Sequence, residues 1–233
     1  MRRTIQSSRC LRARAGATGG SAGGFTLIET SLATLIIGIG VVAMVDAQTA
    51  FLVSNQWSSH AASATFLANE IRELTRNLPK HDPVVGLHLG ADGAGDDALF
   101  GWGPDAGETT VDDFDDIDDF DGMSFSFVGS DGLDDLDLPG PINAYREVIP
   151  DLSIDGEEQV GAMFGWSQIV LVNKVNPYNF GEILDDAFFE DPDGDFPGRE
   201  VDSYPLRVTV EVFYQGVNDI DPTMVNSVTW IVP

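Results

Sequence analysis

The chain has 233 residues, of which 43% are hydrophobic, so it can bury a sizeable core and wholesale disorder is not expected. Its 12 basic and 38 acidic residues give a formal charge of −26, but five arginines fall within residues 1–24 and the remaining 209 residues carry −31. Such a field repels phosphate backbones, so we do not expect the acidic body to bind nucleic acid. The single cysteine, Cys10, excludes an intrachain disulfide.

The N-terminal region combines a basic leader with an apolar segment. Residues 1–24 contain no acid and are followed by 21 mostly apolar residues, Phe25 to Val45. As a helix this segment is roughly 32 Å long, enough to cross a bilayer. Because no Lys or Arg follows it until Arg72, the leader is predicted to be cytoplasmic and the body exported. An ordinary secretory signal is the alternative, but the segment is longer than a typical signal core and no clear cleavage site follows it.

One carboxylate interrupts this apolar segment. Glu29 lies five residues into it, where an unpaired charge costs several kcal/mol. The residues Gly24-Phe25-Thr26-Leu27-Ile28-Glu29 resemble the cleavage and methylation motif of type IV prepilins and type II secretion pseudopilins. The direct resemblance covers about 30 residues, and its details are more similar to minor pilins or minor pseudopilins than to a major shaft subunit.

The resemblance implies a processing and assembly role. A prepilin peptidase would cut after Gly24 and methylate the new amino terminus at Phe25. Glu29 would then be the fifth mature residue and would pair with the terminal amine of an adjoining subunit. The implied partners are the peptidase, other pilin or pseudopilin subunits and the inner membrane. The chain departs from many pilins by having Asp46 where a helix-kinking proline is common.

The helix is expected to continue beyond the membrane. Residues 47–78 contain neither Pro nor Gly, and Pro79 then ends the helical pattern. The apolar residues of this stretch recur at three- and four-residue steps, which predicts one face packed on a core. The predicted stripe consists of Trp57, Ala61, Ala64, Ala68, Ile71, Leu74 and Leu78. Residues 25–78 would then form a single rod of about 80 Å.

The acidic C-terminal region has the pattern of strands separated by loops. Four segments are rich in branched and aromatic residues, and the third alternates apolar with polar positions as a half-buried strand does. These segments are residues 123–128, 164–175, 206–214 and 227–232. We predict an α+β fold in which the helix packs against an antiparallel sheet with acidic loops. The predicted organisation is a leader (1–24), a helix (25–78, with 25–45 transmembrane) and an exported β-rich domain (79–233).

Two acidic loops are candidate cation sites. The run from Asp112 to Asp121 places an apolar residue at every third position and is interpreted as a solvated irregular insertion, with calcium screening or a basic partner as alternatives. In the second loop, alternating carboxylates on a Gly/Pro-bent segment can converge on a calcium ion. The candidate ligands are Asp191, Asp193, Asp195, Glu200 and Asp202. Phe196 stands where an EF-hand loop requires glycine, so the pattern is not an EF-hand.

Catalysis is not expected, because the chain lacks a nucleophile elbow, a zinc motif, a phosphate-binding loop and a dinucleotide fingerprint. His81 beside Asp82 is the nearest approach to a catalytic pair. The sequence therefore predicts a structural pilin-like subunit, held in the inner membrane with its N-terminus cytoplasmic and then assembled into a periplasmic or extracellular filament. The alternative is a single-pass anchored module that binds calcium or a basic ligand.

Overall fold

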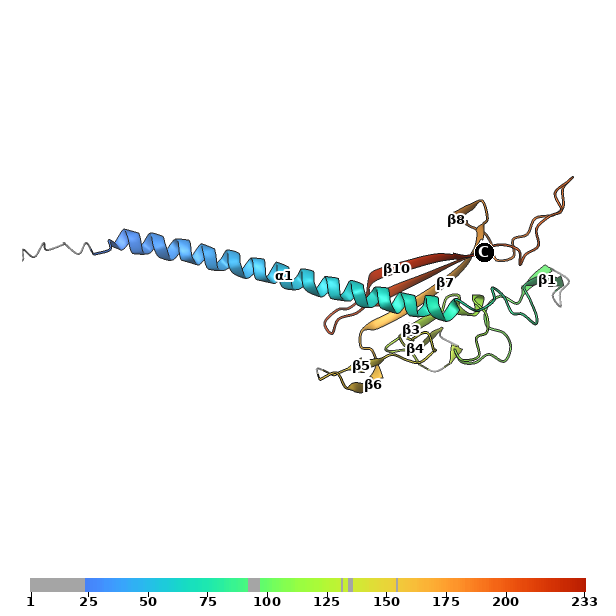
Figure 1. Cartoon of the computed structure of the whole chain (residues 1–233), viewed down its shortest axis with the longest axis horizontal. Coiled ribbons are helices and arrows are strands. Elements are labelled where there is room, and N and C mark those ends of the chain that lie inside the picture. Colours follow the sequence, from blue (N-terminus) through green and yellow to red (C-terminus); the bar gives the residue numbers. More distant parts are fainter. Residues whose placement is uncertain (1–23, 92–96, 131, 134–135, 154) are drawn as a thin grey trace, which may run out of the picture. The chain divides into compact units, whose positions relative to one another are not determined.

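A computed structural model describes residues 24–91, 97–130, 132–133, 136–153 and 155–233 of the chain. The chain is α+β, as the sequence predicts: a long N-terminal helix precedes a set of β-strands (Figure 1). Two compact units, Met1–Leu52 and Val53–Pro233, are distinguished by their internal contacts. The predicted leader lies outside the described residues except for Gly24.

Helix α1 spans Leu27–Thr75, so the predicted rod is confirmed to within three residues at each end. Its last turn carries Arg72, whose positive charge suits the negative end of the helix dipole. The amide of Leu78 donates to the carbonyl of Thr75, which closes a final turn before Pro79. Proline lacks the amide hydrogen that a further turn would need.

A six-stranded sheet forms the centre of the second unit. Five strands follow the order β10-β9-β7-β3-β4, and β8 pairs with β7 off this path. The long strands are antiparallel, with β7 and β9 in register from Trp166 opposite Tyr214 to Lys174 opposite Leu206. The strands are β3 (Ser124–Ser126), β4 (Asp137–Pro139), β7 (Trp166–Asn176), β8 (Asn179–Ile183), β9 (Leu206–Tyr214) and β10 (Thr223–Val232).

Two short ribbons and a turn of 3-10 helix complete the unit. Strand β1 (His88–Ala91) pairs with β2 (Asp97–Phe100), and β5 (Pro150–Leu152) pairs with β6 (Glu158–Ala162). The 3-10 turn η1 (Asp118–Phe120) lies in the acidic run. Each ribbon is antiparallel, so short loops suffice to connect its strands.

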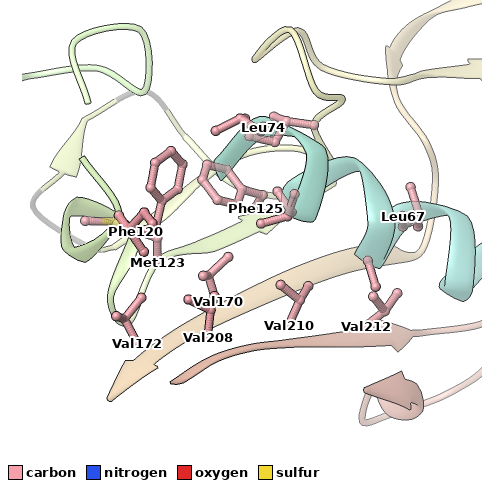
Figure 2. Close-up of a cluster of buried hydrophobic side chains, with 14 of the residues drawn as sticks. Leu67, Leu74, Phe120, Met123, Phe125, Val170, Val172, Val208, Val210 and Val212 are labelled. Carbon is pink, nitrogen blue, oxygen red and sulfur yellow. The ribbon is translucent and has the colours of Figure 1, made fainter. Parts of the chain in front are cut away.

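The core lies between the second part of α1 and one face of the sheet. Buried and partly buried residues alternate along β7 and β9, as the two-residue side-chain period of a strand requires. Valines from both strands face Leu67 and Leu74 of the helix and Phe120, Met123 and Phe125 (Figure 2). A buried amide, Gln168 of β7, donates to the carbonyl of Leu67 at 2.8 Å and so links sheet to helix.

The structure confirms the four predicted strand regions and changes two details. Strands β3 and β4 pair in parallel, so the sheet is mixed and not wholly antiparallel. The buried helical face includes Leu67, which the predicted stripe omits, whereas Trp57 is 54% exposed. Positions 64, 67, 71 and 74 keep one face of the helix on the sheet, and this spacing selects Leu67.

Candidate functional site

The predicted processing site lies just before α1. Gly24 and Phe25 are exposed and precede the first helical residue, Leu27. Phe25 is 85% exposed, so no part of the described fold covers the peptide bond between the two residues. The segment is therefore open to an enzyme that acts on it.

Glu29 forms a capping box with Thr26 at the start of the helix. The Glu29 carboxylate oxygen Oε2 accepts hydrogen bonds from the Thr26 amide at 3.1 Å and from the Thr26 hydroxyl at 3.2 Å. In return, the Glu29 amide donates to the Thr26 hydroxyl at 3.3 Å. These bonds satisfy backbone donors that the first turn of a helix leaves free. The pattern Thr-x-x-Glu is visible in the sequence and is the signal that identifies this second role of Glu29.

Within the described part of the first unit, residues 24–52, the apolar side chains have no covering partner. Residues 24–52 are exposed throughout, including Leu32, Ile36 and Ile37 at 58%, 60% and 64%. α1 is the one helix of the described residues that is long and apolar enough to cross a membrane. An apolar surface of this kind needs either lipid or other protein chains around it.

Most of the acidic run from Asp112 to Asp121 is packed into the core, so the run is not the solvated insertion that the sequence predicts. Its three apolar residues, Phe114, Ile117 and Phe120, are all at most 1% exposed. The ring centroids of Phe114 and Phe120 are 5.1 Å apart in an edge-to-face arrangement. Inserting these side chains carries neighbouring carboxylates inward, so Asp116, Asp118 and Asp119 are buried as well.

A histidine is buried with these carboxylates. His81 Nδ1 lies 3.1 Å from Asp118 Oδ2, whereas the carboxylate of Asp82 accepts from the amides of Val84 and Val85. His81 is therefore in contact with Asp118 and not with Asp82, its neighbour in sequence. His81 Nε2 and Asp118 Oδ1 have no hydrogen-bond partner among the described residues.

Burial favours the neutral forms of this cluster. It raises the pKa of Asp116 to about 9, assisted by a side-chain hydrogen bond with Asp118 and by repulsion from its charge. It likewise raises the pKa values of Asp118 and Asp119 to about 7. Loss of hydration, followed by repulsion from Lys80, lowers the pKa of His81 to about 4. A cluster that is neutral avoids most of the cost of placing charges in a core.

One group of carboxylates among the described residues has the spacing of a cation site. Oxygens of Glu108, Asp115 and Asp119 lie within 4.8 Å of one another. Asp115 is exposed, Glu108 is half-buried and Asp119 is buried, and Asp119 Oδ2 already accepts the amides of Asp115 and Asp116. Oxygen donors of this type suit a hard cation such as calcium. Repulsion from Asp116 and Glu108 adds to burial in raising the pKa of Asp119.

The predicted calcium ligands lie on an exposed hairpin and the segment that follows it. The amides of Asp193 and Phe196 each donate to the other residue's carbonyl at 3.0 Å, which makes a two-residue turn of Gly194 and Asp195. Asp191 precedes this turn. Glu200 and Asp202 follow the hairpin and line a small depression beside His88. The structure does not gather these five carboxylates as it gathers the group at Glu108, so calcium binding by them stays a prediction.

A buried lysine is a feature that the sequence analysis missed. Lys174 is fully buried, and its Nζ donates to the carbonyls of Asp186 and Phe188. Burial lowers its pKa to about 8. The alternation along β7 contains the signal, because Lys174 shares the inward parity of Val170 and Val172.

No protein-family model matches the chain, and neither a curated protein nor a solved structure matches it. The pilin resemblance is therefore supported only by the residues that display it. These are the processing segment at Gly24 and Phe25 and the carboxylate of Glu29. The geometry that bears on them is the exposed peptide before α1 and the capping box at its first turn.

Proposed function

We propose that the chain is a pilin-like structural subunit, made as a precursor, cut after Gly24 and assembled into a pilus or a secretion pseudopilus. The observation that carries the proposal is a carboxylate, Glu29, held in the first turn of an exposed apolar helix. A capping box at this position needs no charge, because glutamine also completes it. A carboxylate whose burial in lipid costs several kcal/mol is therefore better explained by a further role.

The proposed mechanism is assembly without turnover. A subunit that leaves the bilayer exposes the apolar surface of residues 27–52, and neighbouring helices bury it again at roughly 25 cal/mol per Å². Cleavage after Gly24 turns the amide of Phe25 into an ammonium group close to an apolar environment. The Glu29 carboxylate of an adjoining copy would neutralise this ammonium and set the axial register.

N-terminal mass spectrometry of the protein purified from its own cells tests the processing step. A mature chain that begins with N-methylated Phe25 is expected. An intact Met1, or a cut beyond Ala43, contradicts the proposal and favours a plain anchor or signal.

Glu29→Gln and Glu29→Ala separate the charge of Glu29 from its capping role. A glutamine can complete a capping box with Thr26, whereas alanine cannot. If pairing with an ammonium drives assembly, both variants are processed at Phe25 but are lost from sheared filaments. Wild-type incorporation of Glu29→Gln contradicts the charge role, and loss of Glu29→Ala alone assigns Glu29 to the cap.

A second candidate function, a membrane-anchored module that binds calcium, is favoured by the converging oxygens of Glu108, Asp115 and Asp119. Bound calcium stabilises a folded protein in proportion to the logarithm of its concentration above Kd. The full chain in detergent micelles should then melt at a higher temperature in millimolar calcium than in chelator. Glu108→Gln should abolish this increase, whereas Asp193→Asn should leave it intact; no increase in the parent chain removes the candidate.

A further inference from the structure

Most Lys and Arg side chains of residues 25–233 already have a partner within the chain. Residues 25–233 contain seven Lys and Arg side chains. Five of these are bound by backbone carbonyls or packed on aromatic rings: Lys80, Arg146, Lys174, Arg199 and Arg207. The other two lie near the end of α1. Arg76 pairs with Glu73 at 3.2 Å, and Arg72 is exposed with no side-chain partner recorded among the described residues.

These two arginines border a cavity of about 450 Å³ between α1 and β10. Glu73 and Thr75 of the same helix also line it, and the other side of the cavity is apolar, with Leu78, Trp230 and Val232 contributing. Trp230 and Val232 are only partly buried against the core. We call this cavity the arginine groove, defined by Arg72, Glu73, Arg76, Leu78, Trp230 and Val232. It offers a guanidinium rim beside an apolar surface, a combination that accepts aromatic side chains flanked by carboxylates.

The opposite chemistry is concentrated in residues 178–200, which we call the acidic arm. This segment contains eight acidic residues and a single basic one, Arg199. It also exposes large apolar side chains: Tyr178, Phe180, Ile183, Phe188, Phe189 and Phe196. In Figure 1 the arm is drawn in brown beyond β8 and extends away from the sheet. Aromatic side chains of this size are common anchors of protein interfaces.

The arm is fixed at its base. The buried Lys174 binds the carbonyls of Asp186 and Phe188, and the hydroxyl of Tyr204 donates to Glu190 Oε2 at 3.2 Å. The bridge between Glu190 and Arg199 closes the hairpin. Because these contacts fix the base of the arm, docking it costs less conformational entropy than docking a loop without such contacts.

We propose that the acidic arm of one copy docks in the arginine groove of a second copy. The inference rests on the proposed assembly function and adds the pair of surfaces through which exported units meet. Carboxylates at Asp193 and Asp195 face the guanidinium groups of Arg72 and Arg76, and Phe196 enters the apolar part of the groove. The two surfaces differ, so the contact is heterologous and repeats from copy to copy without closing, as a filament requires.

Cysteine cross-linking in filaments tests this contact directly. Cys10 is the only native cysteine, so replacing it with serine leaves a clean background. Glu73→Cys marks the groove and Asp195→Cys marks the tip of the arm, and a bifunctional maleimide is applied to intact filaments. The chain with both cysteines should give a ladder of dimers, trimers and longer species, whereas each single-cysteine chain should stop at dimers. The proposal is wrong if the two cysteines are cross-linked only within one chain, or if intact filaments give no cross-link.

Charge exchange gives an independent test and separates the two proposals. Arg72→Glu with Arg76→Glu, or Asp193→Lys with Asp195→Lys, should lower filament yield about tenfold through repulsion at the contact. Combining all four changes should restore most of the yield. Asp155→Lys with Glu157→Lys, which makes the same charge change outside the arm, should leave the yield unchanged.

An absence of rescue, or a similar loss in the control chain, contradicts docking between arm and groove. If the parent chain forms no filaments and is not cut at Phe25, the assembly function itself fails. If every charge variant forms normal filaments, the docking contact is wrong, whereas the assembly function is not contradicted.

Discussion

The two parts of α1 share one backbone and have opposite surroundings. From Leu27 to Leu52 the apolar side chains are exposed, whereas Leu67 and Ile71 in the second part are fully buried. The first part is apolar on all sides between Leu35 and Val45, and the second has one apolar face that meets the sheet. Hydrophobicity alone thus does not tell whether a helix is stabilised by its own chain. The second part folds with the chain, and the first needs surroundings that the chain does not supply.

The largest expected effect comes from removing a side chain of the buried part. Leu67→Ala should lower the free energy of unfolding by about 2–5 kcal/mol, because it deletes fully buried atoms and leaves a cavity. Chemical denaturation of the full chain in micelles measures this. Ile37→Ala, in the exposed part, should change it by less than about 0.5 kcal/mol. If both substitutions lowered the free energy of unfolding equally, the two parts of α1 would not differ in their surroundings as described.

The exposed part should respond to charge and not to volume. Ile37→Arg puts a guanidinium in the middle of the apolar segment, where insertion into a bilayer costs about 3 kcal/mol. The fraction of protein that resists alkaline extraction of membranes should fall. Phe66→Arg, at an exposed position of the second part, should stay in the membrane fraction as the parent does. Full membrane retention of Ile37→Arg would contradict a spanning role for this segment.

The carboxylates also differ in their surroundings, because Glu29 is exposed whereas Asp116 is buried. A raised pKa in the folded state gives stability that is present at low pH and lost as pH rises through that pKa. Asp118 and Asp119, at about 7, and Asp116, at about 9, should therefore make the protein melt at lower temperature as pH rises from 6.5 to 8. Above about pH 8 the lowered pKa of the buried Lys174 acts in the opposite direction. The lowered pKa of His81 acts in the opposite direction, but only below about pH 6.5.

Asp116→Asn isolates this effect in the presence of a chelator. The variant should melt with a weaker dependence on pH between 6.5 and 8, because its amide does not ionise. Asp112→Asn, at an exposed position of the same run, should keep the full dependence. Identical dependences of melting temperature on pH for the parent and Asp116→Asn would show that Asp116 is not buried in its protonated form.

The smallest expected effect concerns the capping box. Thr26→Ala removes the hydroxyl that accepts the Glu29 amide and should cost about 1 kcal/mol of helix stability at the first turn. Hydrogen exchange at the amides of Ile28, Glu29 and Thr30 should accelerate, whereas Thr26→Ser should behave like the parent. Unchanged exchange in Thr26→Ala would mean that the cap does not stabilise this end of the helix.

Local sequence patterns predicted the helix and four of the strands, β3, β7, β9 and β10, but not the other six strands of the described residues. The absence of Pro and Gly between residues 47 and 78 placed the end of α1 within three residues, and the alternation of Val208, Val210 and Val212 located β9. Thr26 and Glu29 also formed a readable signal, because both partners of a capping box lie within one turn. These features depend on residues that are neighbours in sequence, so the sequence is sufficient to find them.

The acidic run shows what the sequence by itself did not decide. Its carboxylates predicted a solvated loop, because like charges repel when no partner is in view. In the structure the amide of Ile117 donates to the carbonyl of Pro79, and Asp118 meets His81, 37 residues away in sequence. Burial of the three apolar side chains between these carboxylates outweighs the cost of desolvating acids that can take up protons. The sequence by itself determined the helix and the long strands, because their patterns are local, whereas contacts between distant segments decided which charged groups lie inside.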